Sequence, residues 1–105
     1  MNQLQALGLT LACELPVMAV LARSVPIKRL LIIATGASCL THPLAWRAAL
    51  VLSADQYVTG LWLIELCVVL IEALWYQAWL RVGTARALWW SLVANATSFG
   101  LGWLL

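Results

Sequence analysis

Charged side chains are scarce in this chain, which has only four acidic and six basic residues among 105. Hydrophobic residues make up 65% of it, and the mean hydropathy is +0.97. This composition excludes a disordered segment and a soluble globular domain, and it is typical of a polytopic membrane protein. The basic residues form no patch, so nucleic acid is excluded as a partner and the lipid bilayer is expected.

The chain also lacks the motifs of the common enzyme and metal sites. It contains no H-E-x-x-H, no glycine-rich phosphate loop, no C-x-x-C and no spacing that brings a Ser or Cys nucleophile beside a histidine. Cys13, Cys39 and Cys67 lie in separate apolar stretches and are expected to act as small apolar residues. We therefore expect a protein that is not an enzyme and binds no cofactor.

Four apolar stretches are each long enough to cross a bilayer as a helix, which takes about 20 residues. They cover residues 4–22, 29–52, 58–80 and 87–105. The first has no basic residue before it and contains Glu14, so it is expected to be a span and not a cleaved signal peptide. The sequence predicts an all-α, four-transmembrane-helix bundle with short loops, in one integral membrane domain, residues 1–105.

The basic residues indicate how these helices are oriented. Arg23, Lys28 and Arg29 flank the first connection, and Arg81 and Arg86 flank the third. Because Lys and Arg concentrate in cytoplasmic loops, both connections are expected on the cytoplasmic side. The expected location is a bacterial inner membrane, with both termini in the periplasm.

Three glutamates, Glu14, Glu65 and Glu72, interrupt the apolar stretches. An ionisable side chain near the bilayer centre costs about 2.5 to 3.5 kcal/mol on insertion scales, so such residues face the interior of a bundle. Seven positions separate Glu65 from Glu72, which places both on one helix face about 10 Å apart along the axis. That separation suits two successive sites and not one shared proton.

Distances from the basic helix ends predict two polar layers in the membrane. Glu14, Glu72 and Asn95 each lie nine positions from an arginine at a cytoplasmic end, about 13 to 14 Å into the bilayer. His42 and Glu65 lie about 20 and 24 Å from the same side. We predict a midplane cluster of the first three and an outer layer of the other two, which together bind a proton or cation.

Two prolines lie beside this set. Pro16 follows Glu14 by two positions and Pro43 follows His42 directly, and each removes a helical hydrogen bond from the carbonyl four residues earlier. Thr41-His42-Pro43 is a candidate for local unwinding, with a purely structural kink as the alternative.

The seven tryptophans divide by depth. Five lie near the ends of spans, where the amphipathic ring is expected at the membrane interface. These are Trp46, Trp79, Trp89, Trp90 and Trp103. Trp62 and Trp75 lie deeper and are expected to pack between helices.

Part of the polar character is explained by helix packing alone. Small and hydroxyl-bearing residues allow helices to approach closely in lipid, and four of them are interpreted in this way. They are Thr10, Thr35, Ser91 and Ser98.

Two alternatives for the ionisable residues remain open, a metal shell of carboxylates and imidazole, or a tetrapyrrole on His42. No pair among them has the i, i+3 or i, i+4 spacing of helical metal ligands.

Several short motifs resemble a pattern found in small four-helix bacterial membrane proteins. They are Cys13-Glu14-Leu15-Pro16, Thr41-His42-Pro43-Leu44, the pair Glu65 and Glu72, and Asn95 with Ser98 and Gly102. The resemblance covers nearly the whole chain and implies the fold but no particular activity. A second resemblance, to the small multidrug resistance transporters, is architectural and implies by analogy a proton- and cation-binding role for Glu14 in a dimer. The other acids and the Thr-His-Pro element have no counterpart in that pattern.

The expected function is that of a small transporter or channel for a proton or cation. Glu14 and Glu72 are expected to bind the ion, with Glu65 and His42 relaying it from outside. A homo-oligomer is expected because four helices enclose little space. The alternative is a non-catalytic accessory subunit or assembly factor of a larger membrane complex, with its acids paired to basic groups of a partner.

Overall fold

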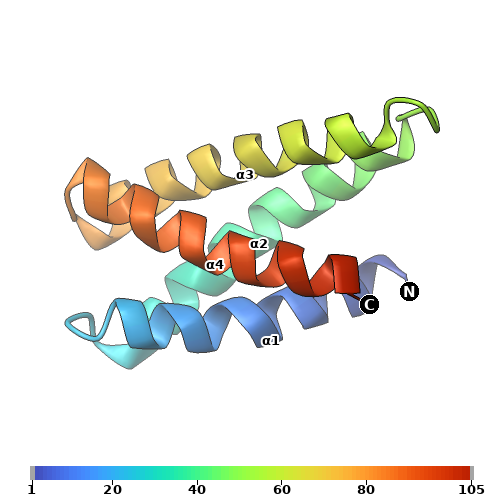
Figure 1. The fold of residues 1–105 in the computed structure, drawn as a ribbon. Helices are drawn as coiled ribbons and strands as arrows, with labels where there is room; N and C mark the ends of the chain where they lie inside the picture. The colour runs from blue at the N-terminus through green and yellow to red at the C-terminus, as the bar shows by residue number, and fades with distance from the viewer. Residues whose placement is uncertain (1, 105) are drawn as a thin grey trace.

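The computed structural model describes residues 2–104, which form four α-helices joined by short connections (Figure 1). The helices are α1 (Gln3–Leu21), α2 (Ile27–Leu50), α3 (Tyr57–Leu80) and α4 (Thr84–Leu104). The described residues contain no β-strand. The prediction of an all-α four-helix bundle is confirmed, and the bundle measures 43 × 25 × 21 Å.

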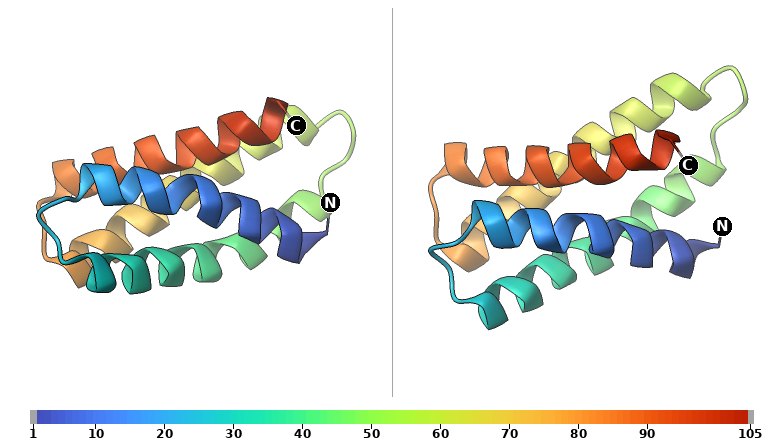
Figure 2. Two further views of the ribbon diagram at one scale, coloured as in Figure 1. Left: turned by 90° about the horizontal axis from the view of Figure 1, so that it is seen from below. Right: turned by 60° about the horizontal axis from the view of Figure 1, so that its bottom comes forward.

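The four helices form a closed ring in which each one packs against two neighbours. Helices α1 and α3 both pack against α2 and α4, whereas the diagonal pairs, α1 with α3 and α2 with α4, have no Cα atoms within 8 Å of each other in residues 2–104. In Figure 1, α3 and α4 lie together where they are joined and separate toward the end that holds the α2–α3 connection. Both termini lie at that same end (Figure 2).

Local interactions and backbone conformation define the start of α1 and the end of α3. At the start of α1, Asn2 and Gln5 form a reciprocal capping box, with bonds of 3.1 and 2.8 Å between each backbone N–H and the other side chain. Helix α3 ends because Arg81 adopts the left-handed conformation, with φ of 55°. Arg29 of α2 donates a bond of 2.6 Å to the carbonyl of Trp79, one of the last carbonyls of α3.

An apolar core fills the half of the bundle beside the α1–α2 and α3–α4 connections. Its buried residues are Met18, Ala22, Leu30, Ile33, Ala34, Ala37, Tyr76, Leu80, Ala87, Trp90 and Ala94. The alanines allow the helix backbones to approach closely. Trp75 packs against this core and donates a hydrogen bond of 2.9 Å to the carbonyl of Ile33. The core therefore holds together the end of the bundle at which four helix ends meet.

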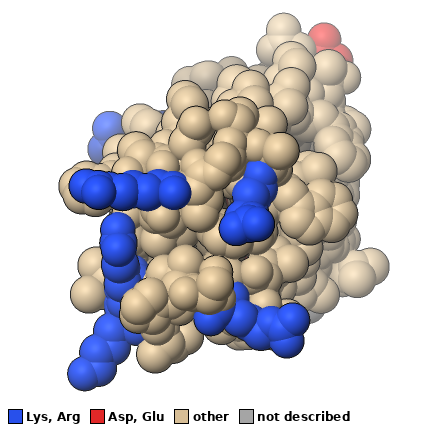
Figure 3. Space-filling model, turned by 90° about the vertical axis from the view of Figure 1, so that its left-hand side faces the viewer, with Lys and Arg blue, Asp and Glu red and all other residues tan. Residues whose placement is uncertain are grey.

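The outer surface of the bundle is largely apolar, and charge is confined to its ends. Large hydrophobic side chains are exposed on all four helices, among them Ile32 of α2 and Leu74 of α3. Figure 3 views the end with the α1–α2 and α3–α4 connections and shows Lys and Arg side chains spread around it. The exposed basic residues of these connections and the helix ends beside them are Arg23, Lys28, Arg29, Arg81 and Arg86.

Two helices, α1 and α3, are long and apolar enough by composition to cross a membrane. Helices α2 and α4 have the length but contain more polar residues, such as Lys28 and His42 in α2 and Arg86 and Asn95 in α4. The prediction of four spans is thus met in part, by two candidate helices.

The structure decides between the alternatives at Thr41-His42-Pro43 and corrects one of the tryptophan predictions. The helix at Thr41-His42-Pro43 is not unwound, because α2 runs without interruption from Ile27 to Leu50 and a proline removes only one of its many hydrogen bonds. Trp90 was expected at the interface but is only 4% exposed. Trp62 was expected between helices, and its ring meets Phe99 of α4 edge to face, with ring centroids 5.1 Å apart, although 59% of the residue is exposed. Position along a helix gives depth, but the direction of the side chain around the axis decides burial.

Candidate functional site

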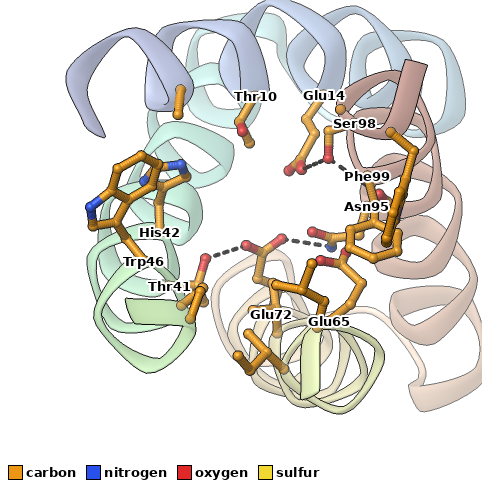
Figure 4. Close-up of a pocket in the computed structure, with 18 of the residues that line it drawn as sticks. Thr10, Glu14, Thr41, His42, Trp46, Glu65, Glu72, Asn95, Ser98 and Phe99 are labelled. Carbon is orange, nitrogen blue, oxygen red and sulfur yellow. Dashed lines mark hydrogen bonds between the residues drawn. The ribbon is translucent and has the colours of Figure 1, made fainter. Parts of the chain in front are cut away.

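A cavity of about 480 Å³ occupies the half of the bundle that the apolar core leaves free (Figure 4). All four helices line it, from the middle of the bundle to the end with the α2–α3 connection. The lining residues are Ala6, Thr10, Glu14, Thr41, His42, Ala45, Trp46, Ala49, Leu50, Tyr57, Leu61, Ile64, Glu65, Val68, Glu72, Asn95, Ser98, Phe99, Gly102 and Trp103. They include all five candidate site residues from the sequence, which are Glu14, His42, Glu65, Glu72 and Asn95.

Glu72 lies at the floor of the cavity, only 1% exposed, and both of its carboxyl oxygens have partners. The hydroxyl of Thr41 on α2 lies 2.6 Å from Oε2, and the amide nitrogen of Asn95 on α4 donates to Oε1 over 2.9 Å. The polar partners of this acid therefore come from the two helices on either side of α3.

Glu14 is held in the same way on the other side of the floor, and it is 2% exposed. The hydroxyl of Ser98 on α4 lies 2.6 Å from Oε2, and the hydroxyl of Ser38 on α2 makes a longer contact of 3.4 Å with Oε1. Acids and donors thus alternate around the ring: α1 and α3 carry the acids, and α2 and α4 carry their donors.

The two acids belong to one hydrogen-bonded network. Asn95 contacts Glu72 directly, and the carbonyl of Asn95 lies 3.2 Å from the Ser98 hydroxyl, which binds Glu14. The Asn95 amide is itself fixed by Ser91, whose carbonyl and hydroxyl oxygens lie 2.9 and 3.2 Å from its nitrogen. The structure therefore brings Glu14, Glu72 and Asn95 together at one level of the bundle.

The hydroxyl beside each acid has a second acceptor on the backbone of its own helix. The Thr41 oxygen lies 3.0 Å from the carbonyl of Ala37, and the Ser98 oxygen lies 3.2 Å from the carbonyl of Asn95. A hydroxyl has one proton to donate and lone pairs to accept with. It can donate to an ionised carboxylate, or accept from a protonated one while donating to the backbone. The site is hydrogen-bonded in both protonation states of the acids.

Glu65 and His42 line the cavity nearer its outer end. Each lies eight positions from the nearer end of the α2–α3 connection, since α2 ends at Leu50 and α3 begins at Tyr57. His42 stacks on Trp46, with ring centroids 6.1 Å apart and planes inclined by 23°. The Oε1 atom of Glu65 and the Nδ1 atom of His42 are buried without a hydrogen-bond partner among residues 2–104. The chain supplies hydrogen-bond donors for the carboxyl groups of Glu14 and Glu72, the floor acids of the cavity, but it supplies no partner for these two atoms.

Sequence reasoning missed the hydroxyl partners of the acids. Ser98 was interpreted as a packing residue, and Thr41 was considered only as part of a proline element. The signal for Thr41 was present, because Ala34, Ala37 and Ser38 precede it at the spacing of one helix face and are all small. All four are buried.

The remaining ionisable and thiol groups stay outside this network. No group of three or more His, Cys, Asp and Glu residues within 2–104 is arranged to hold a metal ion. Cys39 and Cys67 are exposed on the outside of the bundle, and the three cysteines are unpaired. Asp55 lies in the α2–α3 connection, where the Ser53 hydroxyl donates to it over 2.6 Å and holds its pKa below the usual range.

Comparison with models of protein families, with curated proteins and with solved structures found no significant match.

Proposed function

We propose that this chain is a small integral membrane protein whose four helices all cross the bilayer, and that Glu14 and Glu72 bind a proton or small cation during its transport. The proposal is supported by the polarity of the two surfaces of the bundle, by the hydrogen bonding of the acids and by the extent of the cavity.

The bundle has the polarity of a membrane protein, with apolar side chains outside and polar ones inside. Exposed hydrophobic residues cover all four helices, an area that a soluble monomer does not leave bare. The buried residues, by contrast, include six polar or charged ones. These are Glu14, Ser38, Thr41, Glu72, Ser91 and Asn95. Polar groups inside a lipid-facing bundle are expected to face partners or an ion pathway.

This arrangement also accounts for the lower hydropathy of α2 and α4. At 24 and 21 residues these helices are about 36 and 32 Å long, enough for a hydrocarbon layer of about 30 Å. Their polar residues Ser38, Thr41, Ser91 and Asn95 point inward and are buried. These residues lower the mean hydropathy of each helix although they do not contact lipid.

The observation that carries the ion-binding proposal is the pair of hydroxyls with alternative acceptors. Thr41 beside Glu72 and Ser98 beside Glu14 keep each acid hydrogen-bonded whether or not it holds a proton. A purely structural role needs only one of these states. An acid that gains and loses a proton in the membrane needs both.

The cavity gives access to the acids from one end of the bundle only. It extends to the α2–α3 connection, whereas the apolar core closes the end with the basic residues. Transport therefore requires the core around Met18 and Tyr76 to open in turn, as in alternating access around a fixed site.

Proton flux in proteoliposomes tests this function. We expect Glu14→Gln and Glu72→Gln to abolish flux, because Gln keeps the shape and the hydrogen bonds but cannot carry a proton. Asp55→Asn, which neutralises the exposed acid of the α2–α3 connection, is the matched control and should transport normally. Unchanged flux in both Glu→Gln variants would rule the function out.

The membrane topology is tested separately by labelling single cysteines in a background without native cysteines. Ser24→Cys in the α1–α2 connection and Ser53→Cys in the α2–α3 connection are both at exposed positions. We expect a membrane-impermeant maleimide to label them from opposite sides of the membrane. Labelling of both from the same side contradicts four spans.

An accessory subunit of a larger membrane complex is the second candidate, favoured by the unpartnered buried oxygen of Glu65. A basic side chain from another protein would satisfy it. Extraction in mild detergent separates the two functions. A stoichiometric second protein in the purified sample supports the subunit, and a homo-oligomer alone supports the transporter.

A further inference from the structure

Two residues that line the outer half of the cavity each carry a buried polar atom with no partner in the described chain. The two atoms are Oε1 of Glu65 on α3 and Nδ1 of His42 on α2. Leaving a buried acceptor without a donor costs about 1 to 3 kcal/mol, so such atoms point to a missing partner. The floor acids differ in this respect, because every oxygen of Glu14 and Glu72 is contacted by a donor of the chain.

The walls around these two atoms are rich in aromatic rings. On one side His42 stacks on Trp46, and on the other Phe99 meets Trp103 edge to face, with ring centroids 6.0 Å apart. Figure 4 shows the His42 and Trp46 rings across the cavity from Phe99, with Glu65 beside Glu72 on the α3 side. Aromatic faces attract organic cations as well as apolar groups.

The residues that line the cavity favour a cation as the missing partner. The described residues that line the cavity include three glutamates and no Lys or Arg. No three His, Cys, Asp or Glu side chains within residues 2–104 are grouped to hold a metal ion. The volume of about 480 Å³ is instead in the range of pockets for small organic molecules, about 300 to 1,000 Å³.

We propose that the outer half of this cavity binds a small organic amine in its protonated form, with the ammonium N–H groups donating to Glu65 and the organic part against the aromatic walls. In the neutral tautomer with its proton on Nε2, His42 offers Nδ1 as a second acceptor, on a residue that lines the same cavity. The proposal deepens the proposed function, because it names the kind of cation that enters the cavity and rests on that cavity being its route. The acids then have two different roles. Glu65 binds the amine, and the floor acids Glu14 and Glu72 exchange the proton.

Two probes of equal charge distinguish this site from any other cation site. Benzylammonium has three N–H donors, whereas benzyltrimethylammonium carries the same ring and charge but has none. We expect the full chain in nanodiscs to bind benzylammonium about tenfold or more tightly, as measured by isothermal titration calorimetry, because a hydrogen bond to a charged group contributes about that much. Equal or tighter binding of benzyltrimethylammonium overturns the proposal without any mutation.

Variants then assign the binding to Glu65. Glu65→Gln should weaken benzylammonium binding about tenfold or more and leave the weaker binding of benzyltrimethylammonium less affected. His42→Phe keeps an aromatic ring beside Trp46 but removes the acceptor, so a smaller loss is expected. Asp55→Asn is the matched control and should bind like the original chain. Binding unchanged by Glu65→Gln, in a protein with unaltered helical circular dichroism, overturns the assignment.

The outcomes for the two proposals are separable. If Glu14→Gln and Glu72→Gln leave proton flux unchanged while benzylammonium still binds at Glu65, the transport function fails and the amine site stands. If flux depends on the floor acids but the two probes bind equally, the amine site fails and the transport function stands.

Discussion

Asn95 on α4 donates a hydrogen bond of 2.9 Å to Oε1 of Glu72 on α3, in a part of the bundle where both residues are almost completely buried. The contact joins the two helices at the floor of the cavity. It also leaves the other oxygen of Glu72 to Thr41 of α2, so this one carboxyl group connects three helices.

Replacing Asn95 by Ala should destabilise the bundle, because Oε1 of Glu72 would be left buried without a donor. The expected loss is about 1 to 3 kcal/mol in the free energy of unfolding, measured by denaturant titration in detergent. Thr97→Ala is a suitable control on the same helix, since Thr97 donates only to the carbonyl of Val93 in its own helix. Equal stability of the two variants contradicts the prediction.

A double-mutant cycle tests the Asn95–Glu72 bond itself. The stability losses of Asn95→Ala and Glu72→Ala, each of which removes one partner of the bond, should not add, and the coupling between groups in one network is typically about 0.5 to 3 kcal/mol. Additive losses indicate that Asn95 acts through packing alone.

Thr41→Val and Thr41→Ser should separate the role of the hydroxyl from that of the side-chain volume. Valine has nearly the shape of threonine but no hydroxyl, so Oε2 of Glu72 loses its partner and proton flux should fall strongly. Serine keeps the hydroxyl and should retain most of the flux. The assay is proton uptake into proteoliposomes with equal amounts of folded protein. Normal flux in Thr41→Val means that the hydroxyl is not part of the path.

Gly36→Ala and Gly8→Ala should differ in stability although both add one methyl group to a helix. A Cβ at Gly36 would lie 3.2 Å from Cζ2 of Trp75, and Trp75 is held in place by its bond to Ile33, whereas a Cβ at Gly8 would meet nothing within 4 Å. Overpacking typically costs about 1 to 3 kcal/mol, while alanine gains helix propensity at an open position. Gly36→Ala should therefore unfold at lower denaturant concentration than Gly8→Ala. The reverse order contradicts the packing at Trp75.

Trp75→Phe should weaken the contact between α2 and α3. It removes the indole N–H that donates to the carbonyl of Ile33 and leaves a smaller ring against the core, with an expected cost of about 1 to 2 kcal/mol. Trp89→Phe, at a position that is 58% exposed, changes the same atoms on the outside of the bundle and should cost much less. Thermal unfolding in detergent, followed by circular dichroism, compares the two variants. Similar losses would mean that the Trp75 hydrogen bond contributes little.

The sequence predicted the overall fold because long apolar stretches separated by short polar connections leave few alternatives. The helix that contains Glu14 was expected over residues 4–22 and is observed from Gln3 to Leu21, and the helix that contains Glu72 was expected over 58–80 and begins at Tyr57. The second helix ends at Leu50, two residues before the expected end, because Val51 and Leu52 are apolar but form a turn. Hydropathy reports burial in lipid or protein, and it does not report the backbone conformation of the last residues.

The candidate site was predictable in composition but not in its contacts. Spacing from the basic helix ends placed Glu14, Glu72 and Asn95 at one depth, and the structure joins them in one network. The choice of Thr41 over Thr35 as a partner depends on how α2 is rotated and tilted against α3, which the sequence of one chain does not contain. Trp62 lies on the helical repeat that includes Glu65 and Glu72, but it is not among the residues that line the cavity and packs against Phe99 of α4.

The alternation of acids and donors around the ring has a consequence for biogenesis. In the proposed topology, in which all four helices cross the membrane and enter it in chain order, the acids of α1 and α3 arrive before the donors of α4. Until α4 is in place, Glu14 lacks its short bond from Ser98 and Glu72 lacks its bond from Asn95. With that topology, a chain that stalls after α3 carries two acids in lipid that lack part of their hydrogen bonds, a state that the membrane disfavours. The insertion of α4 is therefore the step that completes the hydrogen bonds of both acids.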